Sequence, residues 1–337
     1  MQDKIIIAGP CAAESEEQLM ATAKAICSSY DGPLIFRAGV WKPRTNPNTF
    51  QGIGEQALAW LQRIQQTMNI AVATEVATAS HVVQAMQMGI DYLWIGARTS
   101  ANPIQVQALT DVIAQQLDKH STHRLKGLLV KNPMHQDAAL WIGNIERMER
   151  LGIPVWAVHR GCSHQPAWEM AYTLHQTRPD IPLLIDPSHM GGNKEAIAPL
   201  LTNAWALQYD GAMIETHIHP QDALSDAKQQ LSPDELVALL SADMPKTEDC
   251  DLMWLRSAID EVDNQLWELI EHRMSIANQI GMHKRKQSLA IIQQDRFQHI
   301  LNKRLAWGKA HQLSDTLIHT VMNAIHDESI NVQESKN

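Results

Sequence analysis

The chain has few cysteines, no long apolar run and little positive charge, and each shortage excludes a class of protein. Its 337 residues include four cysteines without paired spacing, which argues against a disulfide framework and indicates reduced thiols in a cytoplasmic protein. No apolar run reaches the roughly 18 residues that a membrane-spanning helix needs, so we expect no membrane partner. A strand-like run begins close to the first residue, so we also expect no signal peptide.

The charge balance argues against a nucleic-acid partner. A net charge of −9 comes from 28 Lys and Arg residues against 37 Asp and Glu residues. Proteins that bind nucleic acid need a basic face, which this composition does not favour. The hydrophobic content of 45% is enough for a full core. A local cluster of cations in such a chain would suit a small anionic metabolite.

Eight short apolar runs, separated by helical stretches, are typical of parallel strands. They cover residues 4–10, 34–40, 71–76, 92–97, 127–132, 155–161, 183–189 and 211–217. This alternation predicts an α/β fold, a (β/α)8 TIM barrel, over residues 1–242. In that fold the active site lies at the carboxyl ends of the strands.

Six cationic side chains fall at or just past the ends of these runs. They are Arg37, Lys42, Arg44, Arg98, Lys131 and Arg160. Solvated surface charges are the plain alternative, but an unpaired charge inside a strand pattern, as at Arg37, would be costly. Guanidinium groups hold phosphate and carboxylate oxygens bidentately, and a lysine adds a compact charge. The pattern predicts a substrate with one or two phosphates.

A second group of strand-end residues is typical of a metal site. It comprises Cys11, His189, Glu215 and the loop residue Asp226. Thiolate, imidazole and carboxylate groups that converge on one barrel mouth favour a divalent cation. Because soft and hard ligands are mixed, the ligand set does not name the ion; Mn²⁺ is our first expectation, with Fe²⁺, Co²⁺ and Zn²⁺ as alternatives.

The strand pattern stops near residue 240. Residues 243–249 are polar and predict a linker. Residues 250–337 follow as three helical patterns, which predict an all-α domain. The first pattern repeats apolar residues every three or four positions over more than seven turns. Since so short a domain cannot bury that seam alone, we expect a homodimer through the helices.

Motifs of the barrel resemble a known family. They are GPC (9–11), KPRTNPNTFQG (42–52), GAR (96–98), HRG (159–161), DPSH (186–189) and LSD (224–226). In combination they resemble metal-dependent 3-deoxy-D-arabino-heptulosonate 7-phosphate (DAHP) synthase, in the subgroup similar to 3-deoxy-D-manno-octulosonate 8-phosphate synthase. The resemblance implies condensation of phosphoenolpyruvate with erythrose 4-phosphate.

The same resemblance assigns roles to residues. It implies that phosphoenolpyruvate is held by Arg37, Arg98, Lys131 and Arg160, erythrose 4-phosphate by Lys42, Arg44 and Thr45, and the metal by Cys11, His189, Glu215 and Asp226. Glu75, at the end of the third run, is a candidate for positioning the water that adds at C2; a salt-bridge role is the alternative.

The helical region resembles the all-α class of chorismate mutase. The motifs are LRSAIDEVDNQLWELIEHR (255–273), GMHK (281–284), DR (295–296), GKAH (308–311) and ESINVQ (328–333). The resemblance implies one pocket for chorismate lined by Arg273, Lys284, Arg296, Ser329 and Gln333, with Arg256 supplied by the other subunit. Phe297 departs from the family, which usually has glutamate there.

The sequence therefore predicts a bifunctional enzyme of the shikimate pathway, a transferase followed by an isomerase. Two alternatives stay open: an octulosonate 8-phosphate synthase barrel, and a helical domain that only dimerises or senses an effector. We further expect that chorismate or prephenate, bound at Arg273 and Lys284, inhibits the barrel.

Overall fold

The structure is a computed structural model that describes residues 4–42, 48–119, 125–163, 165–242, 250–292 and 294–334. The chain forms two compact units, Met1–Ala258 and Ile259–Asn337. The expected linker at residues 243–249 lies outside the described residues.

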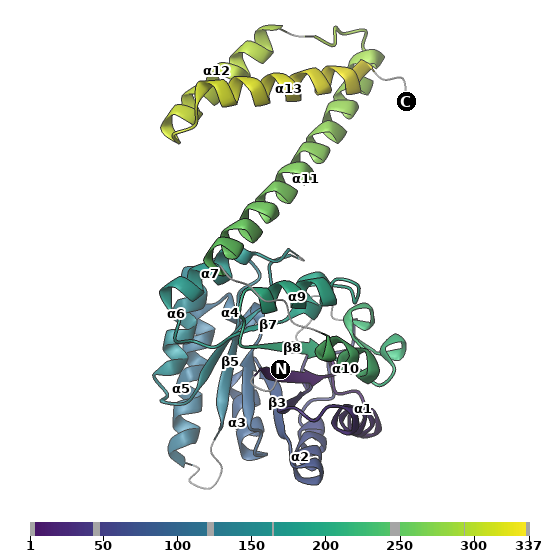
Figure 1. Cartoon of the computed structure of the whole chain (residues 1–337), viewed down its shortest axis with the longest axis vertical. Coiled ribbons are helices and arrows are strands. Elements are labelled where there is room, and N and C mark those ends of the chain that lie inside the picture. Colours follow the sequence, from purple (N-terminus) through teal and green to yellow (C-terminus); the bar gives the residue numbers. More distant parts are fainter. Residues whose placement is uncertain are drawn as a thin grey trace. The chain divides into compact units, whose positions relative to one another are not determined.

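The first unit contains a closed barrel of parallel strands, each hydrogen-bonded to its neighbours in chain order (Figure 1). The strands are β1 (Ile5–Gly9), β2 (Leu34–Arg37), β3 (Ala71–Val76), β4 (Tyr92–Ile95), β5 (Gly127–Lys131), β6 (Val155–His159), β7 (Leu183–Ile185) and β8 (Gly211–Glu215). Pairing of β1 with β8 closes the barrel. The predicted (β/α)8 fold is confirmed.

Helices cover the outside of the barrel (Figure 1). They are α1 (Glu16–Ser29), α2 (Gln56–Met68), α3 (Ala79–Gln87), α4 (Ala97–Ser100), α5 (Pro103–Lys119), α6 (Ala138–Glu149), α7 (Trp168–Thr177), α8 (Pro187–Gly191), α9 (Ile197–Ala206) and α10 (Pro233–Ser241), with 3-10 turns at Pro220–Asp222 and Ala227–Gln229. Several begin at a side-chain cap: Ser15 accepts a hydrogen bond from the Gln18 N–H, and Ser232 forms a capping box with Glu235.

The interior of the barrel is built in layers. One apolar layer takes a single side chain from each strand: Ile7, Ile35, Ala73, Trp94, Leu129, Val158, Leu184 and Met213. Because side chains on a strand alternate between faces, the residues two positions further along point into the same interior. Those positions hold Arg37, Glu75, Lys131, Arg160, Asp186 and Glu215. A polar layer therefore caps the apolar one at the carboxyl mouth.

Several strands end earlier than the apolar runs suggested. The run 183–189 contributes a strand only as far as Ile185, because Asp186 caps α8 and turns the chain. Helix α4 likewise begins directly after Gly96, just past β4. These early turns place polar side chains at the mouth rather than in the sheet.

The C-terminal helices match the three predicted patterns. They are α11 (Cys250–Lys286), α12 (Gln294–Ala310) and α13 (Asp315–Glu334). Helix α11 begins in the first unit and continues into the second. In the second unit α12 packs against α13 (Figure 1). No helix within the described ranges combines the length and the apolar character that crossing a membrane requires.

Candidate functional site

A cavity of about 220 Å³ opens at the carboxyl ends of the barrel strands. Its ionisable lining groups are Lys42, Arg98, Lys131, Arg160, Glu75, His189 and Asp226. Four cations against two carboxylates give the cavity a positive balance in a chain whose net charge is negative. Such a focused positive cavity suits a small ligand with several negative charges.

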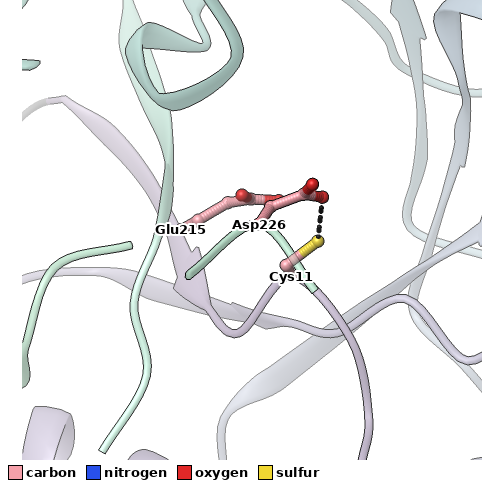
Figure 2. Close-up of side chains that lie close together, drawn as sticks. All are labelled: Cys11, Glu215 and Asp226. Atoms are coloured by element: carbon pink, nitrogen blue, oxygen red, sulfur yellow. Dashed lines mark hydrogen bonds between the residues drawn. The ribbon is translucent and has the colours of Figure 1, made fainter. Parts of the chain in front are cut away.

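Three potential metal ligands lie together beside this cavity (Figure 2). Ligand atoms of Cys11, Glu215 and Asp226 are all within 4.8 Å of one another. Cys11 Sγ donates a hydrogen bond to Asp226 Oδ2 at 2.9 Å. Asp226 adopts a left-handed backbone conformation with φ of 51°, which turns its carboxylate toward the thiol. One sulfur and two carboxylates form a donor set that fits a divalent cation.

The fourth predicted ligand, His189, lies next to this cluster. Its Nε2 atom is 3.6 Å from Glu215 Oε1. Its Nδ1 atom is 2.9 Å from Asp186 Oδ2, so the Asp186 carboxylate fixes the orientation of the ring. A carboxylate behind a histidine is the arrangement that orients metal-bound imidazoles. The structure therefore brings all four predicted ligands to one corner of the mouth.

The Cys11 thiol is buried and pairs with a lysine. Burial, together with the Glu215 carboxylate, raises the pKa of Cys11 to about 12. Lys42 Nζ donates to Cys11 Sγ at 2.9 Å and to the Cys11 carbonyl at 3.1 Å. Burial opposes the charged form of Lys42, but Cys11 and Glu215 outweigh it and raise the lysine pKa. A bound cation would favour the thiolate that metal ligation requires.

Two cations of the cavity are held by buried hydrogen bonds. Lys131 Nζ lies 2.5 Å from Asp186 Oδ2. Burial alone would raise the pKa of Asp186, but His189 and Lys131 hold it well below its usual value. Asn132 accepts a hydrogen bond from the Arg160 backbone N–H at 2.7 Å and donates to the Gly161 carbonyl at 3.0 Å. These contacts fix Lys131 and the backbone of Arg160 in place.

Arg37 lies beneath the cavity rather than on its lining. Its Nη2 atom is 3.2 Å from Glu215 Oε1, and its guanidinium stacks 4.7 Å from the Trp94 ring centroid. Burial raises the pKa of Glu215, but His189 and Arg37 lower it by a larger amount. Arg37 Nε and Nη1 are buried, and no described residue accepts a hydrogen bond from them.

The remaining predicted residues of the barrel differ in position. Arg98 is exposed and lies on the rim of the cavity. Glu75 accepts a hydrogen bond from Trp94 Nε1 at 3.1 Å and lines the cavity. Arg44 and Thr45 lie outside the described residues. That Arg44 and Thr45 bind a sugar phosphate therefore stays a prediction.

Three residues of the site were missed by the sequence analysis. Asp186 and Asn132 directly follow strands β7 and β5, and Gln229 donates to Glu215 Oε2 at 2.7 Å. Asp186 stands in the motif DPSH, where only the histidine was assigned a role. Its position at the end of a strand was the available signal. Asn132 contacts the backbone of Arg160 and Gly161, and Gln229 contacts the Glu215 side chain, and residue type alone does not indicate such contacts.

In the helical unit, predicted residues meet between α11 and α13. Arg273 Nη1 is 2.5 Å from Ser329 Oγ. Gln333 is buried and donates to the Ser329 carbonyl at 3.0 Å, and Lys284 Nζ donates to the Ile291 carbonyl at 2.6 Å. Partial burial lowers the pKa of Arg273. Arg273 and Ser329 thus meet between α11 and α13, whereas Lys284 contacts the segment between α11 and α12 and the Gln333 hydrogen bond lies within α13.

Arg256 and Arg296 are exposed and are not part of that contact. Arg256 belongs to the first compact unit, whereas Arg273 belongs to the second. Phe297, where the resemblance leads one to expect a glutamate, stacks on His326 with ring centroids 3.9 Å apart. Gln293, another position of this region, lies outside the described residues.

Comparison with protein families matches both units. The model of the DAHP synthetase I family matches residues 2–128 and 164–251. The model described as chorismate mutase type II matches residues 255–334. The first match covers most of the barrel, and the second covers the three C-terminal helices from Leu255 onward.

Similar proteins agree with the barrel match. The chain is 30% identical over 251 residues to a phospho-2-dehydro-3-deoxyheptonate aldolase of Thermotoga maritima, covering 72% of this chain and 70% of the relative. It is 28% identical to a 2-dehydro-3-deoxyphosphooctonate aldolase of Wolinella succinogenes, covering 70% of this chain and 96% of the relative. A crystal structure of the Thermotoga maritima heptonate aldolase aligns with a TM-score of 0.60 at 26% identity, covering 70% of this chain and 67% of that one.

The barrel topology, the cation-lined cavity and the family match thus agree. A transferase barrel is followed in the same chain by an isomerase domain. The chain therefore belongs to the DAHP synthetase I family, and the type II chorismate mutase domain that follows its barrel makes the protein a bifunctional enzyme of the shikimate pathway.

Proposed function

We propose that the barrel condenses phosphoenolpyruvate with erythrose 4-phosphate, with release of inorganic phosphate. The observation that carries this proposal is the cavity whose lining holds Lys42, Arg98, Lys131 and Arg160 beside the cluster of Cys11, Glu215 and Asp226. Two phosphorylated substrates need several cations, and an aldehyde that accepts a carbon nucleophile gains from a nearby electrophile.

Phosphoenolpyruvate would be held by Arg37, Arg98, Lys131 and Arg160. Lys131 ends β5 and Arg160 directly follows the adjacent strand β6, and both are buried, so both can reach one anion. Arg160 can hold a phosphate or carboxylate edge bidentately, and Lys131 adds a point charge. No described residue accepts a hydrogen bond from Arg37 Nε or Nη1, so these two donors are available to this ligand or to an ordered water.

Erythrose 4-phosphate would be bound by Lys42, Arg44 and Thr45. A divalent cation held by Cys11, His189, Glu215 and Asp226 would polarise or orient the aldehyde oxygen. Lys42 lies against Cys11, so its ammonium is close to the place where charge develops on that oxygen. Because of this proximity, Lys42 is proposed as a catalytic residue.

The reaction itself needs few chemical groups. C3 of the enol attacks the aldehyde carbon, and the new carbon–carbon bond leaves positive charge at C2. Water adds at C2 and gives up a proton, and cleavage of the C2–O bond of the resulting hemiketal phosphate then releases inorganic phosphate. Glu75 is the carboxylate on the cavity wall that can position this water and take its proton.

The test compares two aldehyde substrates. The purified full chain should consume phosphoenolpyruvate with erythrose 4-phosphate and much more slowly with arabinose 5-phosphate. The relatives that are octonate aldolases make arabinose 5-phosphate the relevant competitor. Lys131→Met should abolish either reaction. Faster turnover with arabinose 5-phosphate would replace the proposal by an octulosonate 8-phosphate synthase.

For the helical unit, we propose that Arg273, Lys284, Arg296, Ser329 and Gln333 bind chorismate and that Arg256 of a second copy completes the pocket. Chorismate carries two carboxylates, so cations are its natural partners. Its rearrangement to prephenate breaks an ether C–O bond and forms a C–C bond within one molecule. Orientation and charge stabilisation at the ether oxygen are enough for that step.

A homodimer through the helices supports this pocket. Ile259, Val262 and Leu269 on α11 are 61%, 57% and 67% exposed in the single chain. Their spacing of three and seven residues places them on one face of the helix. An apolar face of this kind is typical of a surface that a second copy covers.

We also propose feedback: chorismate or prephenate bound at Arg273 and Lys284 inhibits the barrel. A coupling of about 1–3 kcal/mol would change the apparent affinity roughly 5- to 150-fold. The synthase rate of the full chain should fall as prephenate is added. Arg273→Ala should both relieve this inhibition and abolish the mutase activity. Inhibition that persists in Arg273→Ala would place the effector elsewhere.

A further inference from the structure

Trp254 lies in the short segment between the two family matches. The DAHP synthetase match ends at residue 251, and the chorismate mutase match begins at residue 255. It stands near the start of α11 and belongs to the same compact unit as the barrel. Its side chain is fully buried. A simple connection between two domains needs only solvent-exposed residues. A fully buried tryptophan in such a connection therefore indicates a specific structural role.

The Trp254 socket consists of four aromatic rings from the outer layer of the barrel unit. Tyr209 stacks on Trp254 with ring centroids 5.5 Å apart, and Trp168 meets it edge-on at 6.2 Å. Tyr172 and His175 of α7 close the socket at 6.0 and 6.1 Å. Trp254 Nε1 is buried, and no described residue accepts a hydrogen bond from it. The socket therefore recognises the ring by shape and stacking.

This socket is connected to the active site through one histidine. The Tyr209 hydroxyl lies 2.7 Å from His159 Nδ1. Trp168 also contacts the His159 ring, edge-on at 5.7 Å. His159 ends β6 and is followed by Arg160. Because adjacent strand residues point to opposite faces, the outward His159 side chain meets the socket while Arg160 faces the cavity.

The histidine also touches the next strand. Its carbonyl accepts a hydrogen bond from the Asp186 N–H at 2.7 Å. Burial lowers the pKa of His159 to about 3, so the ring stays neutral, and its hydrogen bond with Tyr209 does not change with protonation near neutral pH. The ends of β6 and β7 are thus tied to a rigid contact on the outside of the barrel.

We propose that Trp254 is a positioning residue for the anion pocket of the barrel. By filling the socket it holds Tyr209 and His159, and these set the place of Arg160 in the cavity. The proposal rests on the proposed function, since it takes Arg160 as a phosphoenolpyruvate contact. Under this proposal the start of α11 affects substrate binding by the synthase, although that segment follows the barrel in the chain.

The experiment uses the full chain and a set of single variants. Trp254→Ala empties the socket, Trp254→Phe keeps a ring there, and Tyr209→Phe removes only the hydroxyl contact with His159. The matched control is Trp267→Ala, which removes a tryptophan that is 68% exposed on the same helix. For each variant one measures KM for phosphoenolpyruvate, KM for erythrose 4-phosphate, kcat and the mutase rate.

Trp254→Ala should raise KM for phosphoenolpyruvate roughly tenfold, less than the roughly 100-fold that a misplacement of about 1 Å can cost, because Arg160 keeps its contact with Asn132. The value of kcat and KM for erythrose 4-phosphate should change less than about twofold, which marks a loss of substrate binding rather than of the chemical step. Trp254→Phe should restore KM, because the indole N–H has no described acceptor to lose. Tyr209→Phe should raise KM in the same direction, and Trp267→Ala should leave it unchanged.

An unchanged KM in folded Trp254→Ala, or no restoration by Trp254→Phe, overturns the proposal. Should Trp254→Ala fail to fold, the KM of Tyr209→Phe decides the matter in the same way. Arg160→Lys separates this inference from the function on which it rests. If Arg160→Lys raises KM while the Trp254 and Tyr209 variants do not, only the positioning role fails; if Arg160→Lys has no effect, the assigned phosphoenolpyruvate contact is wrong.

Discussion

The buried contact between Lys131 and Asp186 allows a sharp prediction about stability. The two charged atoms lie 2.5 Å apart, and both side chains are almost completely buried. The perturbation is a set of three variants of the full chain: Lys131→Met, Asp186→Asn and the double variant. Asparagine keeps the N-cap oxygen that accepts the His189 N–H, so the start of α8 is preserved.

The size of the stability loss follows from leaving one buried charge without its partner. Removing one partner of a buried pair costs about 3–5 kcal/mol, whereas replacing both partners by neutral groups costs little. In Lys131→Met the Asp186 carboxylate still has His189 at 2.9 Å, so we expect the lower end, about 3 kcal/mol. For a barrel of this size that corresponds to a fall in Tm of about 6–12 °C.

The assay is thermal unfolding followed by circular dichroism at neutral pH. The Tm of the double variant should be closer to the Tm of the wild type than that of either single variant. Losses that simply add, with the double variant the least stable, would refute the view that the single variants suffer from an uncompensated charge.

The pH dependence has a definite sign. Asp186 has a pKa well below its usual value, so its contribution to stability is present above the unfolded pKa of about 4. That contribution is lost as the pH falls through the folded pKa. Wild type should therefore lose stability below about pH 4 more steeply than Asp186→Asn does.

Other predictions concern metal, subunit exchange and binding. Chelation by EDTA should abolish condensation and leave chorismate rearrangement unchanged; full condensation activity in exhaustively chelated protein would contradict the metal proposal. Inactive Arg256→Ala and Arg273→Ala chains, mixed by refolding, should recover about a quarter of the wild-type mutase activity if subunits mix freely and each pocket takes Arg256 from its partner; no recovery in mixed dimers would exclude action in trans. Asn132→Ala frees the backbone of Arg160 and should raise KM for phosphoenolpyruvate more than it lowers kcat. Phe297→Glu should increase mutase activity if the missing acidic group limits recognition of the substrate hydroxyl; a lower rate would show that stacking on His326 matters more.

Much of the barrel site was predictable because it depends on strand ends. In a parallel barrel all strands deliver their last inward residue to the same mouth, so Lys131 and Glu215 could be placed together from the sequence. Cys11 was placed by the same rule, although it follows β1 rather than belonging to it. The first C-terminal helix was predictable because its apolar residues repeat every three or four positions over more than seven turns.

What the sequence did not reveal depends on pairwise packing. Arg37 was expected to help hold phosphoenolpyruvate, but the sequence did not reveal that stacking on Trp94 and pairing with Glu215 hold it beneath the cavity lining. No periodic pattern encodes such a contact, because the partners stand on different strands. The same applies to Trp254, whose neighbours come from α7 and from the segment after α9. A lone tryptophan at the start of a polar helix has no local signal for its socket.

The first residues of α11 have a practical consequence for anyone who wishes to separate the two activities. A cut ahead of residue 250 would leave the Trp254 socket open to water, and the exposed rings would favour aggregation of the isolated barrel. A cut after Ala258 would instead remove Leu255 and Arg256 from the mutase match, which begins at residue 255. Residues 250–258 serve both halves of the gene product. Fragments that each carry their own copy of this segment are therefore the ones to express.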